Sequence, residues 1–221
     1  MFCIDRYINE LHVHMKNIFG SRMCYLGLQG SYLRGEATEQ SDIDIMVVID
    51  DFSVQDMDAY RRIISGMESP ERSCGFICGR KELENWNPME ICHLLHCTKD
   101  YYGVLSDLVP SYTEEDVRNY VKLSLNNLYH ELCHRYIHSS REENIAQLPG
   151  TYRSVFFVLQ NLHYLRTGVF PQTKTEMLSL LSGRDKQVLE RYLAFCAESL
   201  YDFDEAFALI FAWCKDTLVS L

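Results

Sequence analysis

The sequence predicts a two-domain α+β protein, with a mixed domain of strands and helices over residues 1–109 and an all-helical bundle over residues 110–221. Two short apolar runs, residues 24–29 and 42–49, have the length and composition of buried strands. Beyond Val109-Pro110-Ser111 every segment has the periodicity of a helix, which is typical of an antiparallel bundle. The change of pattern at this proline marks the expected boundary.

The other elements of the first domain follow from periodicity and from capping signals. Ser53 and Asp56 form a capping box, which predicts the start of a helix. Pro88 leads into an apolar run that we interpret as a strand. Besides the two strands above, the expected elements are helices over residues 2–19 and from Ser53, a short helical segment over 81–86, and strands over 74–78 and 89–96.

The second domain is expected to contain five helices. Thr113 with Asp116 and Thr173 with Glu176 are spaced as capping boxes at two of the helix starts. The polar residues 139–148 are expected to form a loop. The predicted helices run from Thr113 to about residue 138, over 151–166, from Thr173, over 185–200 and over 203–219.

Composition is that of an ordinary globular protein. The 221 residues are 47% hydrophobic, and no run approaches the roughly 18 apolar residues that a membrane-spanning helix needs. The N-terminus has no basic stretch followed by an apolar core, so we expect no signal peptide and a cytoplasmic location. Nine cysteines without a secretion signal indicate free thiols rather than a disulfide framework.

Residues 26–49 combine the features of a metal site and a phosphate site. Asp42 and Asp44 lie two positions apart at the start of a strand, so their side chains share one face. Carboxylates this close repel each other unless a proton or a cation lies between them. Mg²⁺ typically takes one or two carboxylates together with phosphate oxygens. Gly30 permits a tight turn, and Ser31 with the amides around it can donate hydrogen bonds to a phosphate.

This stretch resembles the signature of the DNA polymerase β-type nucleotidyltransferases. The matching residues are Gly30-Ser31, Arg34-Gly35 and Ser41-Asp42-x-Asp44, followed by an apolar run. The spacing is similar to that of the small stand-alone bacterial members. With its helical second half, the chain resembles bacterial aminoglycoside nucleotidyltransferase-like proteins. The resemblance implies a polymerase β-like nucleotidyltransferase domain followed by a substrate-binding helical bundle. It also implies transfer of a nucleoside monophosphate, with AMP as the first candidate, from Mg·ATP or another Mg·NTP. The acceptor would be a hydroxyl of a small molecule such as an aminoglycoside.

The resemblance assigns roles to individual residues. Asp42 and Asp44 would be catalytic and hold Mg²⁺, and family members usually bring a third carboxylate from a neighbouring strand. Glu90 is the only acid inside its expected strand, so it is the candidate for this third metal ligand or for the general base. Glu82 and Glu84 are the alternatives. The residues expected to bind the nucleotide are Gly30, Ser31, Arg34, Ser41 and Lys174.

Lys174 belongs to the second domain. The tract Tyr164-Leu165-Arg166-Thr167-Gly168, followed by Thr173-Lys174, resembles the helical domain of aminoglycoside adenylyltransferases, in which a lysine contacts the triphosphate. Gln160 stands near the place where that resemblance implies an arginine. If Thr173 is an N-cap, Lys174 occupies the first helical turn, where exposed amides and the helix dipole attract an anion. The alternative is a solvated lysine.

A second motif, His130-Glu131-Leu132-Cys133-His134, matches H-E-x-x-H and is followed one turn later by His138. Histidines at this spacing share a helix face and can bind zinc, with Glu131 as general base. Because core positions lie beside this face and no strand frames a cleft, we predict no structural zinc there. Glu131 has a second possible use, as a base supplied by the helical domain in some aminoglycoside nucleotidyltransferases.

Two rival functions stay open at this point. One is an antitoxin-like regulatory nucleotidyltransferase that binds or modifies a partner protein, and the other is a nucleotide-binding scaffold without activity. The net charge of −10 disfavours a polynucleotide, because phosphate-backbone binding depends on clustered Lys and Arg. We therefore expect a nucleoside triphosphate and a small acceptor as partners, with a cationic compound as the first candidate for the acceptor. We expect neither nucleic acid nor a membrane as a partner.

Overall fold

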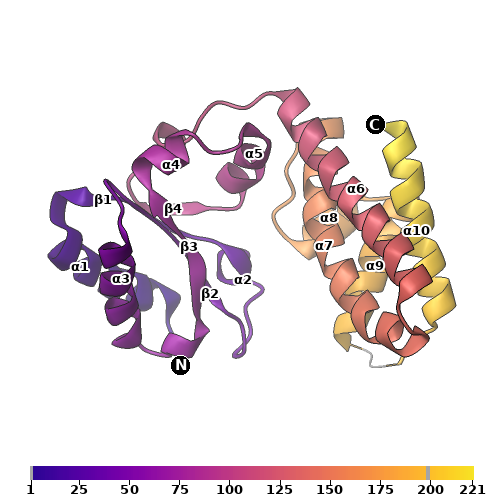
Figure 1. The fold of residues 1–221 in the computed structure, drawn as a ribbon, viewed down its shortest axis with the longest axis horizontal. Coiled ribbons are helices and arrows are strands. Elements are labelled where there is room, and N and C mark those ends of the chain that lie inside the picture. Colours follow the sequence, from indigo (N-terminus) through magenta and orange to yellow (C-terminus); the bar gives the residue numbers. More distant parts are fainter. Residues whose placement is uncertain (1, 198–199) are drawn as a thin grey trace. The chain divides into compact units, whose positions relative to one another are not determined.

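A four-stranded mixed sheet organises the first half of the chain in the computed structural model, which describes residues 2–197 and 200–221 (Figure 1). The strand order is β3-β2-β1-β4. The central strand β1 pairs antiparallel with both β2 and β4, whereas β2 pairs parallel with the edge strand β3. The strands are β1 (Met23–Leu28), β2 (Ile43–Ile49), β3 (Ser73–Gly79) and β4 (Lys99–Tyr102).

Helices cover both faces of this sheet. Helices α1 (Ile4–Phe19) and α3 (Val54–Ser65) pack on one face. They contact Ile45, Val47 and the other β2 residues whose side chains point to that face. The opposite face of β2 presents Asp44, Met46 and Val48, and α4 (Arg80–Glu84) and α5 (Pro88–His96) contribute apolar side chains there. Because side chains alternate along a strand, the aspartates lie on the α4–α5 side.

The remainder of the chain is a bundle of helices with its own hydrophobic core. Its core includes Leu125, Tyr152, Phe156 and Trp213, all nearly or fully buried. The helices are α6 (Glu114–His138), α7 (Arg141–Thr167), α8 (Lys174–Leu180), α9 (Gly183–Ala197) and α10 (Phe203–Ser220). No helix within the described residues is long and apolar enough to span a membrane.

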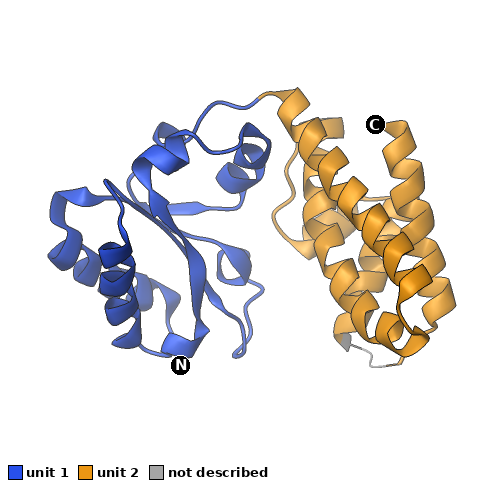
Figure 2. Cartoon of the chain, viewed as in Figure 1, with its two compact units in different colours: residues 1–112 blue, residues 113–221 orange. Residues whose placement is uncertain are grey.

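The chain divides into two compact units, which we call the N-terminal unit (Met1–Tyr112) and the C-terminal unit (Thr113–Leu221) (Figure 2). The division lies a little beyond Val109. The N-terminal unit also contains a single helical turn, α2 (Gly30–Leu33), directly after β1. Short 3₁₀ segments complete it: η1 (Gly20–Arg22), η2 (Pro70–Arg72) and η3 (Leu105–Asp107).

One predicted strand is wrong: residues 89–96 lie in the helix α5. Asn87 is its N-cap, since the side-chain oxygen accepts a hydrogen bond from the backbone N–H of Met89 at 3.1 Å. Pro88 occupies the first helical position, where its fixed φ fits and its missing N–H costs nothing. A short apolar run fits a strand and a buried helix equally well, and here the Asn-Pro start decides for the helix.

The loop predicted for residues 139–148 is also wrong, because α7 already begins at Arg141. Ser140 and Glu143 form a capping box: the Ser140 Oγ accepts from the Glu143 N–H at 3.2 Å, and the Glu143 carboxylate accepts from the Ser140 N–H at 2.9 Å. Most polar residues of this segment lie on the exposed face of a helix, whereas Asn144 is buried and its side chain donates to the Ser140 carbonyl at 2.9 Å. The S-x-x-E spacing is the signal that specifies this start.

Pro149 lies inside α7 without ending it. A proline has no N–H, so the carbonyl of Ile145, four residues earlier, loses its intrahelical donor. The Tyr201 hydroxyl donates a hydrogen bond to this Ile145 carbonyl instead. The donor that the helix lacks is thus supplied by the segment just before α10.

Candidate active site

Asp42 and Asp44 lie at the beginning of β2 and project to the same side of the sheet. Asp42 directly precedes the strand and is exposed, and Asp44 is its second residue and half-buried. Within the residues that the structure describes, the Asp42 carboxylate makes no hydrogen bond or ion pair and is therefore open to a cation. This arrangement is the one expected from the alternation of a strand.

The glycine turn after β1 presses against the second of these aspartates. The backbone N–H of Gln29 donates to the carbonyl of Asp44 at 2.8 Å, which fixes the end of β1 beside the start of β2. Gly30 follows with φ of +68°, and a Cβ built on it would lie 1.9 Å from the Asp44 Oδ2. Only a glycine allows this approach. Ser31 follows in α2, so the expected phosphate-binding turn and the expected metal ligands form one site.

Two further residues of the expected nucleotide site already have partners within the protein. The Arg34 Nε lies 3.1 Å from the Glu36 Oε2, and the two side chains are only 13% and 19% exposed. The Ser41 Oγ accepts a hydrogen bond from the backbone N–H of Thr38 at 2.8 Å. A phosphate would therefore compete with these contacts, so both residues also hold the connection between α2 and β2.

Cys74 occupies the position beside Asp44 on the neighbouring strand. In the parallel pairing of β2 with β3, Asp44 is the partner of Cys74, so the two side chains project to the same face. Partial burial raises the pKa of the Cys74 thiol, and the negative charges of Asp44 and Asp42 raise it further. The strand that flanks the aspartates thus supplies a neutral thiol rather than a third carboxylate.

Glu90 does not complete the aspartate pair. It lies in the first turn of α5, and its carboxylate accepts a hydrogen bond from the Trp86 indole N–H at 2.5 Å. The alternative Glu84 is paired with Arg80 at 2.8 Å. Among the described residues, no group of three or more His, Cys, Asp or Glu side chains is arranged to hold a metal ion. The geometric reason for choosing Glu90 disappears, because its segment is a helix and not a strand of the sheet.

A histidine of α5, His93, lies close to Arg34 on the same side of the sheet. Burial lowers the pKa of His93 in α5 to about 4, and the positive charge of Arg34 lowers it further. His93 is therefore neutral at physiological pH. Its neighbours Cys92 and Cys97 are thiols whose pKa burial raises to about 11 and about 12. These side chains pack α5 and carry no charge toward a nucleotide.

The C-terminal unit holds the remaining candidates. Thr173 caps α8 by accepting from the Glu176 N–H at 3.1 Å, so Lys174 does occupy a first helical turn, with its Nζ 5.6 Å from the Phe156 ring centroid. Glu131 is held by Arg135 at 2.6 Å and accepts from the Thr151 hydroxyl at 3.1 Å. Glu131 therefore joins α6 to α7.

The histidines of the H-E-x-x-H motif form an exposed row on α6. Ring centroids are 5.9 Å apart between His130 and His134, and 4.8 Å apart between His134 and His138. The expectation that they bind no structural zinc stays a prediction.

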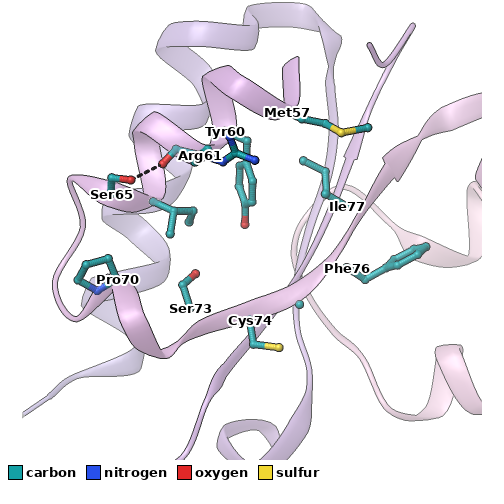
Figure 3. A pocket seen from close by; sticks show the side chains of 11 residues that line it. Met57, Tyr60, Arg61, Ser65, Pro70, Ser73, Cys74, Phe76 and Ile77 are labelled. Atoms are coloured by element: carbon teal, nitrogen blue, oxygen red, sulfur yellow. Dashed lines mark hydrogen bonds between the residues drawn. The ribbon is translucent and has the colours of Figure 1, made fainter. Parts of the chain in front are cut away.

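A pocket of about 460 Å³ lies between α3 and β3. Figure 3 shows Ser73 pointing toward Tyr60, whereas Cys74 points away from them. Tyr60, Ile64 and Ile77 belong to the core on the α1–α3 face. This pocket therefore lies at the edge strand β3, where it is lined by α3 and by residues 73–77 of that strand.

The residues present fit a Mg²⁺ ion bound together with phosphates. Two carboxylates on one strand face, with the backbone of a glycine turn against one of them, provide hard oxygen ligands beside a phosphate cradle. Mg²⁺ commonly takes only one or two protein carboxylates and completes its shell with phosphate oxygens and water. A neutral thiol at residue 74 is compatible with that arrangement.

Comparisons with known proteins agree with this geometry. Residues 25–119 match the family model described as a nucleotidyltransferase domain. A search of curated proteins finds no match. Among solved structures, spectinomycin adenyltransferase AAD(9) from Enterococcus faecialis, crystallised with ATP and spectinomycin, matches with a TM-score of 0.60 and 14% identity, over 97% of this chain and 98% of that one. At this identity the likeness shows a shared fold.

Proposed function

We propose that this chain transfers a nucleoside monophosphate, with AMP as the first candidate, from Mg·NTP to a hydroxyl of a small molecule; the match of residues 25–119 to the nucleotidyltransferase domain model supports this proposal. The observation that carries this proposal is the contact of the Asp44 carboxylate with Gly30. It places a pair of potential metal ligands directly against a turn suited to phosphate. A nucleotide without a metal, or a metal without a nucleotide, would use only half of this site.

The residues of the N-terminal unit have separable roles in the proposed reaction. Asp42 and Asp44 offer oxygen ligands, and Gly30 and Ser31 offer the backbone and hydroxyl donors for the β- and γ-phosphates. A bound Mg²⁺ would neutralise charge on the phosphates and make the acceptor hydroxyl easier to deprotonate. The acceptor hydroxyl loses its proton to water and its oxygen bonds to the α-phosphorus. The bond from that phosphorus to the bridging oxygen breaks, and pyrophosphate leaves.

The proposed acceptor is a cationic, hydroxylated small molecule of the aminoglycoside type. The net charge of −10 favours a cation over an anionic polymer. AAD(9), whose fold this chain shares, was crystallised with spectinomycin. Lys174 stays a candidate for a triphosphate contact, because it follows the Thr173 cap in the first turn of α8.

Calorimetry on the full chain tests the nucleotide part of the proposal. Wild type should bind ATP in the presence of Mg²⁺ and much more weakly in EDTA, and Asp42→Asn/Asp44→Asn should lose the metal-dependent part. Asp58→Asn is the matched control, because Asp58 is an exposed aspartate of α3 paired with Arg61 at 3.5 Å. Equal binding with and without Mg²⁺ would contradict the site as drawn.

A second measurement addresses the acceptor. Wild-type protein with Mg·ATP is screened against aminoglycosides and neutral polyols, and pyrophosphate release is followed. Release that depends on an aminoglycoside and disappears in the double aspartate variant supports the proposal. Release with a protein acceptor alone would favour the regulatory alternative.

A further inference from the structure

One arginine, distant in sequence from the motif, joins the two halves of the candidate site. Arg72 ends η2 and directly precedes β3. Its Nε and Nη2 donate hydrogen bonds to the backbone carbonyl of Ser41 at 3.0 and 2.9 Å. Its Nη2 also donates to the Tyr32 hydroxyl. Ser41 is the residue before Asp42, and Tyr32 lies in the helical turn that Gly30 begins.

Aromatic rings hold the Arg72 guanidinium in this position. Its central carbon lies 4.9 Å from the Phe2 ring centroid and 5.8 Å from that of Tyr32, and the two rings are themselves 5.6 Å apart. A guanidinium is attracted to the face of an aromatic ring, and its planar fork presents several donors in a fixed geometry. The side chain is half-buried. Arg72 is therefore a fixed tie rather than a mobile surface charge.

Other contacts also restrain the segment between Tyr32 and Ser41, including the pairing of Arg34 with Glu36 at 3.1 Å. Between Tyr32 and Ser41 the chain leaves α2 and returns to β2, and the Glu36 N–H donates to the Ser31 carbonyl at 2.9 Å. The hydrogen bond from Thr38 to Ser41 lies within the same connection. Both of these bonds are local to the segment. Arg72 reaches it from the other side of β2, because Ser73 is the strand partner of Ile43.

We propose that Arg72 is a positioning residue that holds the glycine turn and the aspartate pair in register and thereby sets the affinity for Mg·NTP. This proposal rests on the proposed function for its consequence, and on the hydrogen bonds above for its geometry. Arg72 acts through the backbone of Ser41 and the hydroxyl of Tyr32. The nucleotide contacts remain those of Gly30, Ser31 and the aspartates.

A direct contact of Arg72 with phosphate is the competing explanation, and the two make different predictions for lysine. A phosphate ligand can be replaced in part by another cation. The hydrogen bonds of the Arg72 guanidinium to one carbonyl and one hydroxyl cannot be replaced by lysine, because an ammonium on a flexible stem lacks the planar geometry. Arg72→Lys therefore separates charge from positioning.

Hydrogen–deuterium exchange of the nucleotide-free protein measures how strongly Arg72 restrains this segment. Peptides covering residues 30–44 should exchange roughly tenfold faster or more in Arg72→Gln and in Arg72→Lys, because charged hydrogen bonds of this kind are lost. Peptides from α1 and from α7 should keep their wild-type rates. Tyr32→Phe should give a smaller increase. Arg61→Gln, at an arginine whose side chain is 79% exposed, should match wild type.

Calorimetry with Mg·ATP on the same variants reads the consequence. Both Arg72 variants should bind at least about tenfold more weakly, whereas Arg61→Gln should bind as wild type does. Unchanged exchange in residues 30–44 for both Arg72 variants, or full Mg·ATP affinity in Arg72→Lys, would overturn the proposal. If wild type itself binds no Mg·ATP, the proposed function fails, and the exchange measurement still decides whether Arg72 orders this segment.

Discussion

At the scale of single residues, two glycines of the motif have nearly the same positive φ and different surroundings. Gly30 has φ of +68° and Gly35 has φ of +69°. A Cβ on Gly30 would overlap the Asp44 carboxylate, whereas a Cβ on Gly35 would meet nothing within 4 Å. Both substitutions to alanine carry the strain of a left-handed backbone, about 1–3 kcal/mol. Only the first one also displaces Asp44, a proposed metal ligand.

We therefore expect Gly30→Ala and Gly35→Ala to lower the free energy of unfolding, and Gly30→Ala to lower it more. Gly30→Ala should also abolish Mg²⁺-dependent ATP binding, while Gly35→Ala retains it. Urea denaturation and calorimetry on the two variants check this pair of outcomes. Equal loss of ATP binding in both would mean that backbone strain, and not the contact with Asp44, governs the site.

Cys74 shows what the motif alone does not reveal. The paired aspartates predict a metal site from residues two positions apart, but the residue beside Asp44 on the next strand depends on the register of β2 with β3. Sequence patterns do not give that register. The expectation of a third carboxylate on the flanking strand led to Glu90, whereas the pairing places a thiol at that position.

At the scale of elements, α3 is attached to the sheet through its first turn. Asp56 is 6% exposed, and the two nitrogens Nη1 and Nη2 of Arg22 donate to its carboxylate at 3.0 and 2.7 Å. Ser53, the N-cap, donates from its N–H at 2.9 Å and from its hydroxyl at 2.8 Å. The hydrogen bonds from Arg22, followed by those from Ser53, hold the pKa of Asp56 well below its usual range.

The sign of the pH dependence follows from this lowered pKa. A carboxyl group with a lower pKa in the folded state stabilises the fold above its unfolded pKa of about 3.9, and this contribution is lost as the pH falls. Asp56→Asn should therefore lower the free energy of unfolding at pH 7 by about 1.5–3 kcal/mol. The difference from wild type should narrow at pH 3.

Urea denaturation at the two pH values measures this difference, with Asp58→Asn on the exposed side of α3 as the control. A difference that is as large at pH 3 as at pH 7 would show that the lost contacts act through packing rather than through the charge of Asp56.

Elements with a local start signal can be predicted, and those without one cannot. The capping boxes at Ser53 and Thr113 specify α3 and α6 at their observed starts. The strand β4, Lys99–Tyr102, has no comparable signal, since it is a short edge strand with two polar and two aromatic residues. Its place is decided by pairing with β1, a contact distant in sequence.

At the scale of the whole molecule, the two units have separate hydrophobic cores. The core built around Trp213 and Tyr152 lies entirely within the C-terminal unit, and the cores on the two faces of the sheet lie within the N-terminal unit. We expect a fragment of residues 113–221 to fold alone, because its apolar side chains are buried by one another. Circular dichroism should show a helical spectrum and a cooperative thermal transition. A gradual loss of signal on heating would contradict this independence.

The candidate site contains residues that are close together in sequence and one residue, Arg72, that is distant from them. Gly30, Ser31, Asp42 and Asp44 can be read from one stretch of sequence, because a turn and the start of a strand bring them together. Arg72 lies outside that stretch, and nothing in the sequence distinguishes it from an ordinary surface arginine. Its contact with Ser41 arises only from the parallel placement of β3 beside β2.

The proline inside α7 has a consequence for the order in which a growing chain acquires its contacts. A ribosome releases the residues around Ile145 well before Tyr201. Until that tyrosine emerges, the Ile145 carbonyl lacks the hydroxyl donor that it has in the folded protein. The N-terminal end of α7 is therefore finished by a residue synthesised after the helix itself. During synthesis this contact therefore cannot form until the segment that directly precedes the last helix, α10, has been made.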